Sequence, residues 1–178
     1  NDAALALQGA VTGTLAATAS SGGITDSSNL SATGNVTLND VATAGITLGT
    51  LEADANVILT AAGNTAITND AALALQGAVT GTLAATATTG DITDSDALAV
   101  SGASVFTLGA DGTNITLDSA ANAFSGAVTL KAGSSGGQTF GNIVFVDSGA
   151  IDFDSAASAD GDLFLDGGTD NTVGGTLA

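Results

Sequence analysis

The chain contains no histidine, cysteine, proline, methionine, tryptophan or tyrosine, and Lys131 is its single basic residue. Without histidine or cysteine, the serine–histidine and thiol mechanisms of nucleophilic catalysis are excluded. Disulfides and thiolate metal sites are excluded for the same reason. Proline removes a donor from a strand ladder, so its absence suits a body made of strands. The lack of cysteine is compatible with export but does not assign a compartment.

The charge is almost entirely negative. Glu52 and 17 aspartates against one lysine give a net charge of −17. Nucleic acids and anionic membrane surfaces require cationic side chains, so we expect neither as a partner. No apolar run reaches 18 residues, which argues against membrane insertion, and no signal peptide is recognisable. The chain starts inside a repeat, and we expect it to be a piece of a longer protein.

An internal repeat dominates the sequence. Residues 1–19 return unchanged at 69–87, which gives 19 identities at an offset of 68. A weaker motif recurs around small pivot residues at positions 9, 34, 55, 77, 102 and 126. Their spacing predicts a unit of 21–28 residues, three of which make the 68. We therefore expect one continuous solenoid, divided into 1–68, 69–137 and an Asp/Phe-rich end at 138–178.

The repeated unit has the pattern of strands and turns. Ile46-Thr-Leu48, Phe106-Thr-Leu108 and Val128-Thr-Leu130 alternate apolar and polar residues with period two, which predicts β-strands. Glycine, serine, asparagine and aspartate clusters such as 20–23 separate these triplets and indicate turns. The sequence is thus predicted to be all-β.

Two architectures fit short strands at this spacing. One is a parallel β-helix of seven to eight coils, and the other is an antiparallel sandwich or barrel. Repeated sequence favours the β-helix, because each residue in a stack lies beside its counterpart one coil away. We expect one core ladder of isoleucines, formed by Ile24, Ile46, Ile67, Ile92 and Ile115. All six phenylalanines follow residue 105, so the coil should widen there.

No catalytic residues are predicted. β-Helix enzymes that act on acidic polysaccharides need basic residues to hold the sugar, and one lysine does not provide such a cleft. Asp152 and Asp154 share a strand face and could act as paired carboxylates, but a solvent-facing strand explains them as well. Threonine rows of the ice-binding kind would need a regularity that Thr12-Gly-Thr14 and Thr80-Gly-Thr82 lack.

Calcium is the one candidate ligand. Seven aspartates fall within 147–170, several of them in glycine-rich turns, and hard carboxylate oxygens suit Ca²⁺. Solvated acidic turns are the alternative explanation, and no cofactor is required. The candidate calcium ligands are Asp152, Asp154, Asp160, Asp162, Asp166 and Asp170.

The segment 112–130, GTNITLDSAANAFSGAVTL, resembles the strand repeats of large exported bacterial surface proteins of the filamentous-haemagglutinin and autotransporter-passenger kind. The cysteine-free, glycine-rich style extends over the whole chain. The resemblance implies a right-handed β-helix, an extracellular or cell-surface location, and an adhesive or structural role. It carries no catalytic residues.

We therefore expect a non-enzymatic rod of a bacterial extracellular filament or adhesin. Its partners would be flanking coils of a longer chain, or further copies stacked end to end as a homopolymer. The alternative is an adhesin module that binds surface glycans without self-assembly. It would need an exposed aromatic side chain, for which Phe140 and Phe145 are the candidates, although both also suit a core.

Overall fold

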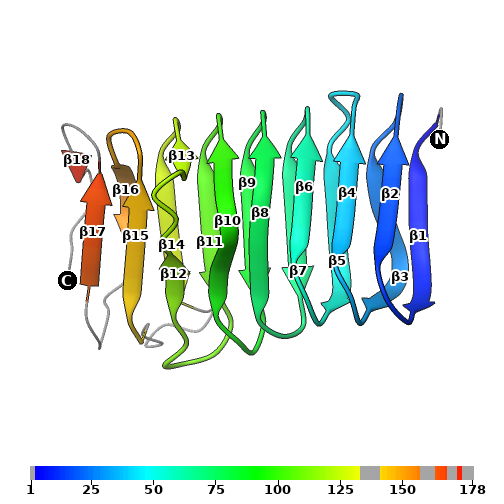
Figure 1. Ribbon diagram of the computed structural model, residues 1–178, viewed down its shortest axis with the longest axis horizontal. Coiled ribbons are helices and arrows are strands. Elements are labelled where there is room, and N and C mark those ends of the chain that lie inside the picture. Colours follow the sequence, from blue (N-terminus) through cyan, green and yellow to red (C-terminus); the bar gives the residue numbers. More distant parts are fainter. Residues whose placement is uncertain (1–2, 133–140, 157–162, 168–171, 174–178) are drawn as a thin grey trace.

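A computed structural model (Figure 1) gives an elongated all-β body. The structure describes residues 3–132, 141–156, 163–167 and 172–173. Within these ranges there is no helix, and therefore none long and apolar enough to cross a membrane. The strands are β1 (Leu5–Val11), β2 (Leu15–Ala19), β3 (Ile24–Ala32), β4 (Val36–Asp40), β5 (Ile46–Ala53), β6 (Val57–Ala61), β7 (Thr65–Asn69), β8 (Leu73–Val79), β9 (Leu83–Ala87), β10 (Ile92–Val100), β11 (Ser104–Leu108), β12 (Ile115–Leu117), β13 (Ala123–Phe124), β14 (Val128–Ala132), β15 (Ile143–Asp147), β16 (Asp152–Ala156), β17 (Leu163–Gly167) and β18 (Thr172–Val173).

The strands form two parallel sheets that face each other. The first sheet runs β1-β3-β5-β7-β9-β11-β14-β16-β18. The second runs β2-β4-β6-β8-β10-β12-β15-β17, with β13 also paired to β10. Successive strands alternate between the sheets, so one strand from each makes a coil, and about seven coils make the solenoid. In Figure 1 the chain advances from right to left, rising in the nearer sheet and descending in the farther one, which is a right-handed coil. The parallel pairing excludes the antiparallel sandwich.

Alternation along each strand explains why two sheets form. In β4, Val36 and Leu38 point inward and are fully buried, while Thr37 faces outward. The same pattern in β6 buries Val57 and Leu59. Each strand therefore has one apolar face, which can leave water only by packing against the opposite sheet. The core is the single layer between them.

The 68-residue repeat does not contain a whole number of coils. β1 and β8 have the same sequence, LALQGAV, but β1 belongs to the first sheet and β8 to the second. Because β8 is the seventh strand after β1, the offset equals three and a half coils, and the prediction of three units was wrong. Each strand of 5–19 therefore lies in the opposite sheet from its copy in 73–87: β1 and β9 are in the first sheet, and β2 and β8 are in the second. The real building block is one strand with its turn, which fits either sheet.

The single isoleucine ladder is likewise corrected. All five isoleucines are buried, but they form separate stacks. Ile24 pairs with Ile46 in the first sheet, whereas Ile92 pairs with Ile115 in the second. Ile67 stacks on Leu48, because the coil that begins at Ile46 is short and brings Thr65 opposite it.

Coil lengths vary more than the predicted 21–28 residues. Residues stacked on one another are as few as 18 apart, at Asn64 and Thr82, and as many as 28, at Asn114 and Asn142. The longest coils coincide with a stack of buried aromatic rings, which supports the expected widening. Ring centroids are 5.9 Å apart for Phe106 and Phe124, 4.9 Å for Phe124 and Phe145, and 5.3 Å for Phe145 and Phe153.

Candidate functional site

Two aspartates bind the backbone of the following coil in the same way. Asp26 accepts hydrogen bonds from the N–H groups of Gly49 (3.0 Å) and Thr50 (2.6 Å) and from the Thr50 hydroxyl (2.8 Å). Its counterpart, Asp94, accepts from the N–H groups of Asp118 (3.1 Å) and Ser119 (3.0 Å). Each carboxylate therefore satisfies two consecutive donors where the neighbouring strand departs from regular pairing.

The environment of Asp26 favours its charged form. Partial burial alone would raise the pKa of its carboxyl, because burial disfavours charge. The hydrogen bonds from Gly49 and Thr50 outweigh that effect and lower the pKa below its ordinary value of 3.8. Asp26 is thus an ionised structural group, and its oxygens are occupied by the protein itself.

Buried asparagines close the coil corners. Asn69, which is fully buried, accepts from the Ala53 N–H (2.8 Å) and donates to the carbonyls of Ala53 (3.1 Å) and Ala72 (2.6 Å). Asn122, also fully buried, accepts from the Leu98 N–H (2.8 Å) and donates to Asp94 (2.6 Å). These side chains replace backbone partners that the turning chain cannot supply. Sequence reasoning missed both roles, because nothing local distinguishes them from surface asparagines.

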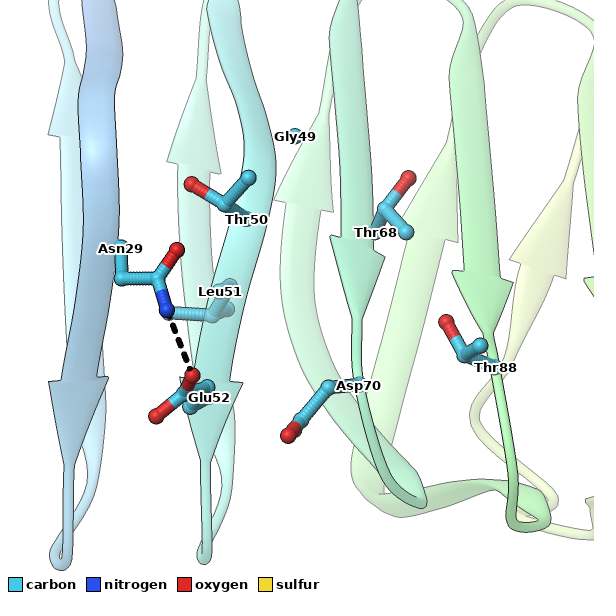
Figure 2. Close-up of a pocket in the computed structure, with 8 residues that line it drawn as sticks. All are labelled: Asn29, Gly49, Thr50, Leu51, Glu52, Thr68, Asp70 and Thr88. Carbon is cyan, nitrogen blue, oxygen red and sulfur yellow. Dashed lines mark hydrogen bonds between the residues drawn. The ribbon is translucent and has the colours of Figure 1, made fainter.

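The outer face of the first sheet carries a shallow depression of about 260 Å³ (Figure 2). Its most polar contact is the hydrogen bond from the Asn29 amide to a Glu52 carboxylate oxygen, 2.9 Å. Asp70 lies beside this pair, and Thr68 and Thr88 follow on the next coils, as Figure 2 shows. The remaining lining residues are Gly49, Thr50 and Leu51. Carboxylate, amide and hydroxyl groups are present, but among the described residues no three acidic side chains gather to hold a metal ion.

A second hollow, of about 360 Å³, lies at the corner that follows β4, β6 and β8. It is rimmed by Val41, which is 59% exposed, beside the buried Asp40. One Asp40 oxygen accepts from the Gly45 N–H at 2.8 Å and so closes the loop from Val41 to Gly45. The other oxygen is buried without a hydrogen-bond partner. A single carboxylate beside apolar walls provides no recognisable ligand set.

Of the six candidate calcium ligands, only Asp152 has a side chain within the described residues. Asp152 is exposed on β16 and faces outward. Asp154 and Asp166 have described backbones in β16 and β17, but their side chains lie outside the described residues. Asp160, Asp162 and Asp170 lie entirely outside them. Calcium binding in this region stays a prediction.

Two residues near the end of β15, Asp147 and Phe145, are buried and contribute to the fold. Asp147 is 3% exposed and accepts from the N–H groups of Phe124 (3.1 Å) and Gly149 (3.2 Å). Phe145 is fully buried among other rings and offers no ring to a glycan. Phe140, the other aromatic candidate, lies outside the described residues.

Of the 14 acidic residues whose backbone the structure describes, nine lie in strands and five lie in the connections between them. Asp54, Asp70, Asp91 and Asp111 all lie in the connections between strands. The outward positions of β2, β4 and β6 carry alanine, threonine, asparagine and isoleucine instead. The outer face of the second sheet is thus uncharged over these three strands.

Comparison with known sequences agrees with this stack of similar units. A family described as repeats of unknown function (DUF5649) matches residues 1–61 and again 62–131. The chain belongs to this repeat family. The DUF5649 match divides the chain a few residues before the boundary at 69 that the exact repeat suggests. No curated protein and no solved structure matches the chain.

Proposed function

We propose that this chain is a non-enzymatic rod segment of a bacterial surface filament or adhesin. The observation that supports it is the arrangement of the two parallel sheets, whose hydrogen bonds all run along the long axis. Bending such a rod requires many of these bonds to deform together, so stacked coils are stiff. The resemblance of 112–130 to exported surface proteins supports the extracellular location.

Extension by further coils follows from the same geometry. Each coil contacts its two neighbours, so length can grow without a change of fold. Flanking coils of a longer chain, or further copies stacked end to end, would continue both sheets. The net charge of −17 would keep neighbouring rods apart while their ends pair.

Electron microscopy of the chain and of a covalent head-to-tail duplicate tests the rod. Seven coils at about 4.8 Å each predict a length of roughly 35 Å, and the duplicate should be straight and roughly twice as long. Two bodies joined at variable angles would contradict the proposal. Antibodies against the chain should label intact cells of the source organism, and labelling only after permeabilisation would contradict a surface location.

A further inference from the structure

One sequence in this chain occurs in two structural environments. The segment 73–87 lies inside the stack, where Leu75 and Leu83 are at most 1% exposed. The identical segment 5–19 forms β1 and β2 at the end of both sheets, and its Leu7 and Leu15 are only partly buried. No described strand lies beyond β1 and β2. The inner copy therefore shows what the outer copy would look like when covered.

The cover over the inner copy is the strand–turn–strand segment Val57–Asn69. Its β6 pairs with β8, placing Val57 opposite Leu75, and its β7 pairs with β9, placing Thr65 opposite Leu83. Backbone bonds continue through the turn. The Thr80 N–H donates to the Ala61 carbonyl, and the Thr65 N–H donates to the Thr82 carbonyl, both at 2.8 Å.

Glycine geometry shows that the end strand already has the shape of the covered one. Gly77 has a positive φ of 110°, and a methyl group there would overlap the Leu59 carbonyl oxygen of the covering strand. Gly9 has nearly the same backbone, with φ of 100°, but a methyl group there would meet nothing within 4 Å. The backbone at Gly9 is thus preformed to receive a carbonyl group from a parallel strand.

We propose that the β1–β2 end binds a strand–turn–strand segment from another repeat of this family, of the kind formed by Val57–Asn69. By the 68-residue equivalence, the segment would place its Val57 position against Leu7, its Leu59 position against Gly9 and its Thr65 position against Leu15. Binding would extend both sheets and bury the partly exposed leucines. This inference rests on the proposed function, for which it names the contact that continues the rod.

A peptide with the sequence of residues 57–69 tests the proposal in solution. The peptide would carry an acetyl group and a fluorophore, and would be used at concentrations where sedimentation shows it to be monomeric. Fluorescence anisotropy with the whole 178-residue chain should show saturable binding. A peptide carrying aspartate at the Leu59 position is the matched control and should not bind, because its charge would be buried unpaired.

Two variants locate the site. Leu7→Asp puts a charge on the docking surface and Gly9→Ala fills the space for the carbonyl, so each should weaken binding about tenfold or more. Ala6→Asp adds the same charge on the exposed outer face and should bind like the wild type. Circular dichroism would confirm that each variant keeps its strands.

The outcomes separate this inference from the rod proposal. The docking site would be overturned if peptide binding did not saturate. It would also be overturned if the Leu7→Asp and Gly9→Ala variants bound the peptide as tightly as the wild type does. If electron microscopy still showed the covalent duplicate as a rod of double length, the proposed function would survive that failure. A flexible duplicate combined with site-specific peptide binding would instead overturn the rod and keep the docking site.

Discussion

Asp26 and Asp94 hold equivalent hydrogen-bond patterns on opposite faces of the rod. Asp26 lies in β3 of the first sheet and Asp94 in β10 of the second, yet each accepts from two consecutive N–H groups of the next coil. The Gln8–Ser27 and Gln76–Ser95 hydrogen bonds repeat this equivalence at 3.0 and 2.7 Å. The two sheets are therefore interchangeable environments for one strand-and-turn unit.

Replacing Asp26 with asparagine should destabilise the rod in a pH-dependent way. At neutral pH we expect a loss of about 1 kcal/mol, because charge-assisted hydrogen bonds become neutral on a partly exposed group. The pKa of Asp26 is lowered in the folded state, so its stabilisation is complete above the unfolded value of about 4 and disappears as the pH falls through the lower folded pKa. Thermal unfolding from pH 7 to pH 2 measures this difference. Asp54→Asn, in an exposed turn, is the control, and a gap between Asp26→Asn and wild type that persisted at the lowest pH would contradict the account.

Phe145→Ala should lower the free energy of unfolding far more than Val41→Ala does. Phe145 is fully buried between Phe124 and Phe153, and a buried phenylalanine changed to alanine costs about 3–5 kcal/mol. Val41 is 59% exposed, so Val41→Ala should stay within about 0.5 kcal/mol. Urea denaturation measures both, and comparable losses would show that the aromatic stack is not part of the core.

Gly9→Ala and Gly77→Ala should differ in stability, although the two glycines lie in identical sequences. Both place alanine at a positive φ, which costs about 1–2 kcal/mol. Only Gly77 has a carbonyl group above it, so Gly77→Ala must also push β6 away from β8. Its unfolding midpoint should fall clearly below that of Gly9→Ala. Equal midpoints would mean that the two copies have the same neighbours.

Asn69→Ala should weaken the corner between β7 and β8. The substitution leaves the N–H and carbonyl of Ala53 and the carbonyl of Ala72 without the partners that Asn69 supplies. Buried backbone groups left unpaired cost about 1–3 kcal/mol each, so we expect a loss of roughly 3 kcal/mol. Chemical denaturation tests this value. Asn39→Ala, on the partly exposed outer face of β4, should change stability little, and a similar loss for both would contradict the role of Asn69.

Much of the fold was predictable from local pattern, and the parts that were not depend on register. Alternation in segments such as Ile46-Thr-Leu48 predicts strands with one buried face, and the repeat predicts their parallel stacking. Coil counting failed because the pivot glycines have two different roles. Gly9 and Gly77 lie within strands, whereas Gly34 and Gly102 lie at corners, and their sequence contexts look alike. The strand sequences also carry no mark of the sheet to which they belong, since LALQGAV forms β1 in the first sheet and β8 in the second.

The candidate site was less predictable than the fold. Composition singles out the aspartates at 160, 162 and 170, which the sequence predicts to lie in turns. Aspartates and asparagines with defined structural roles, such as Asp26 and Asn122, instead contact groups more than 20 residues away. Such partners depend on which coil lies adjacent, and a variable coil length conceals that from a sequence pattern.

Distances between pairs of spin labels test the half-coil arrangement most directly, and the absence of native cysteine makes such labelling specific. One outward row of the first sheet contains Ala6, then Ala66 three coils further along, then Ala84 four coils from Ala6. Ala74 lies on the second sheet. With cysteine at each position, the Ala6–Ala74 pair should give a longer distance than both Ala6–Ala66 and Ala6–Ala84, because its labels project from opposite faces. An Ala6–Ala74 distance between the other two would place the repeats on one face and contradict the account.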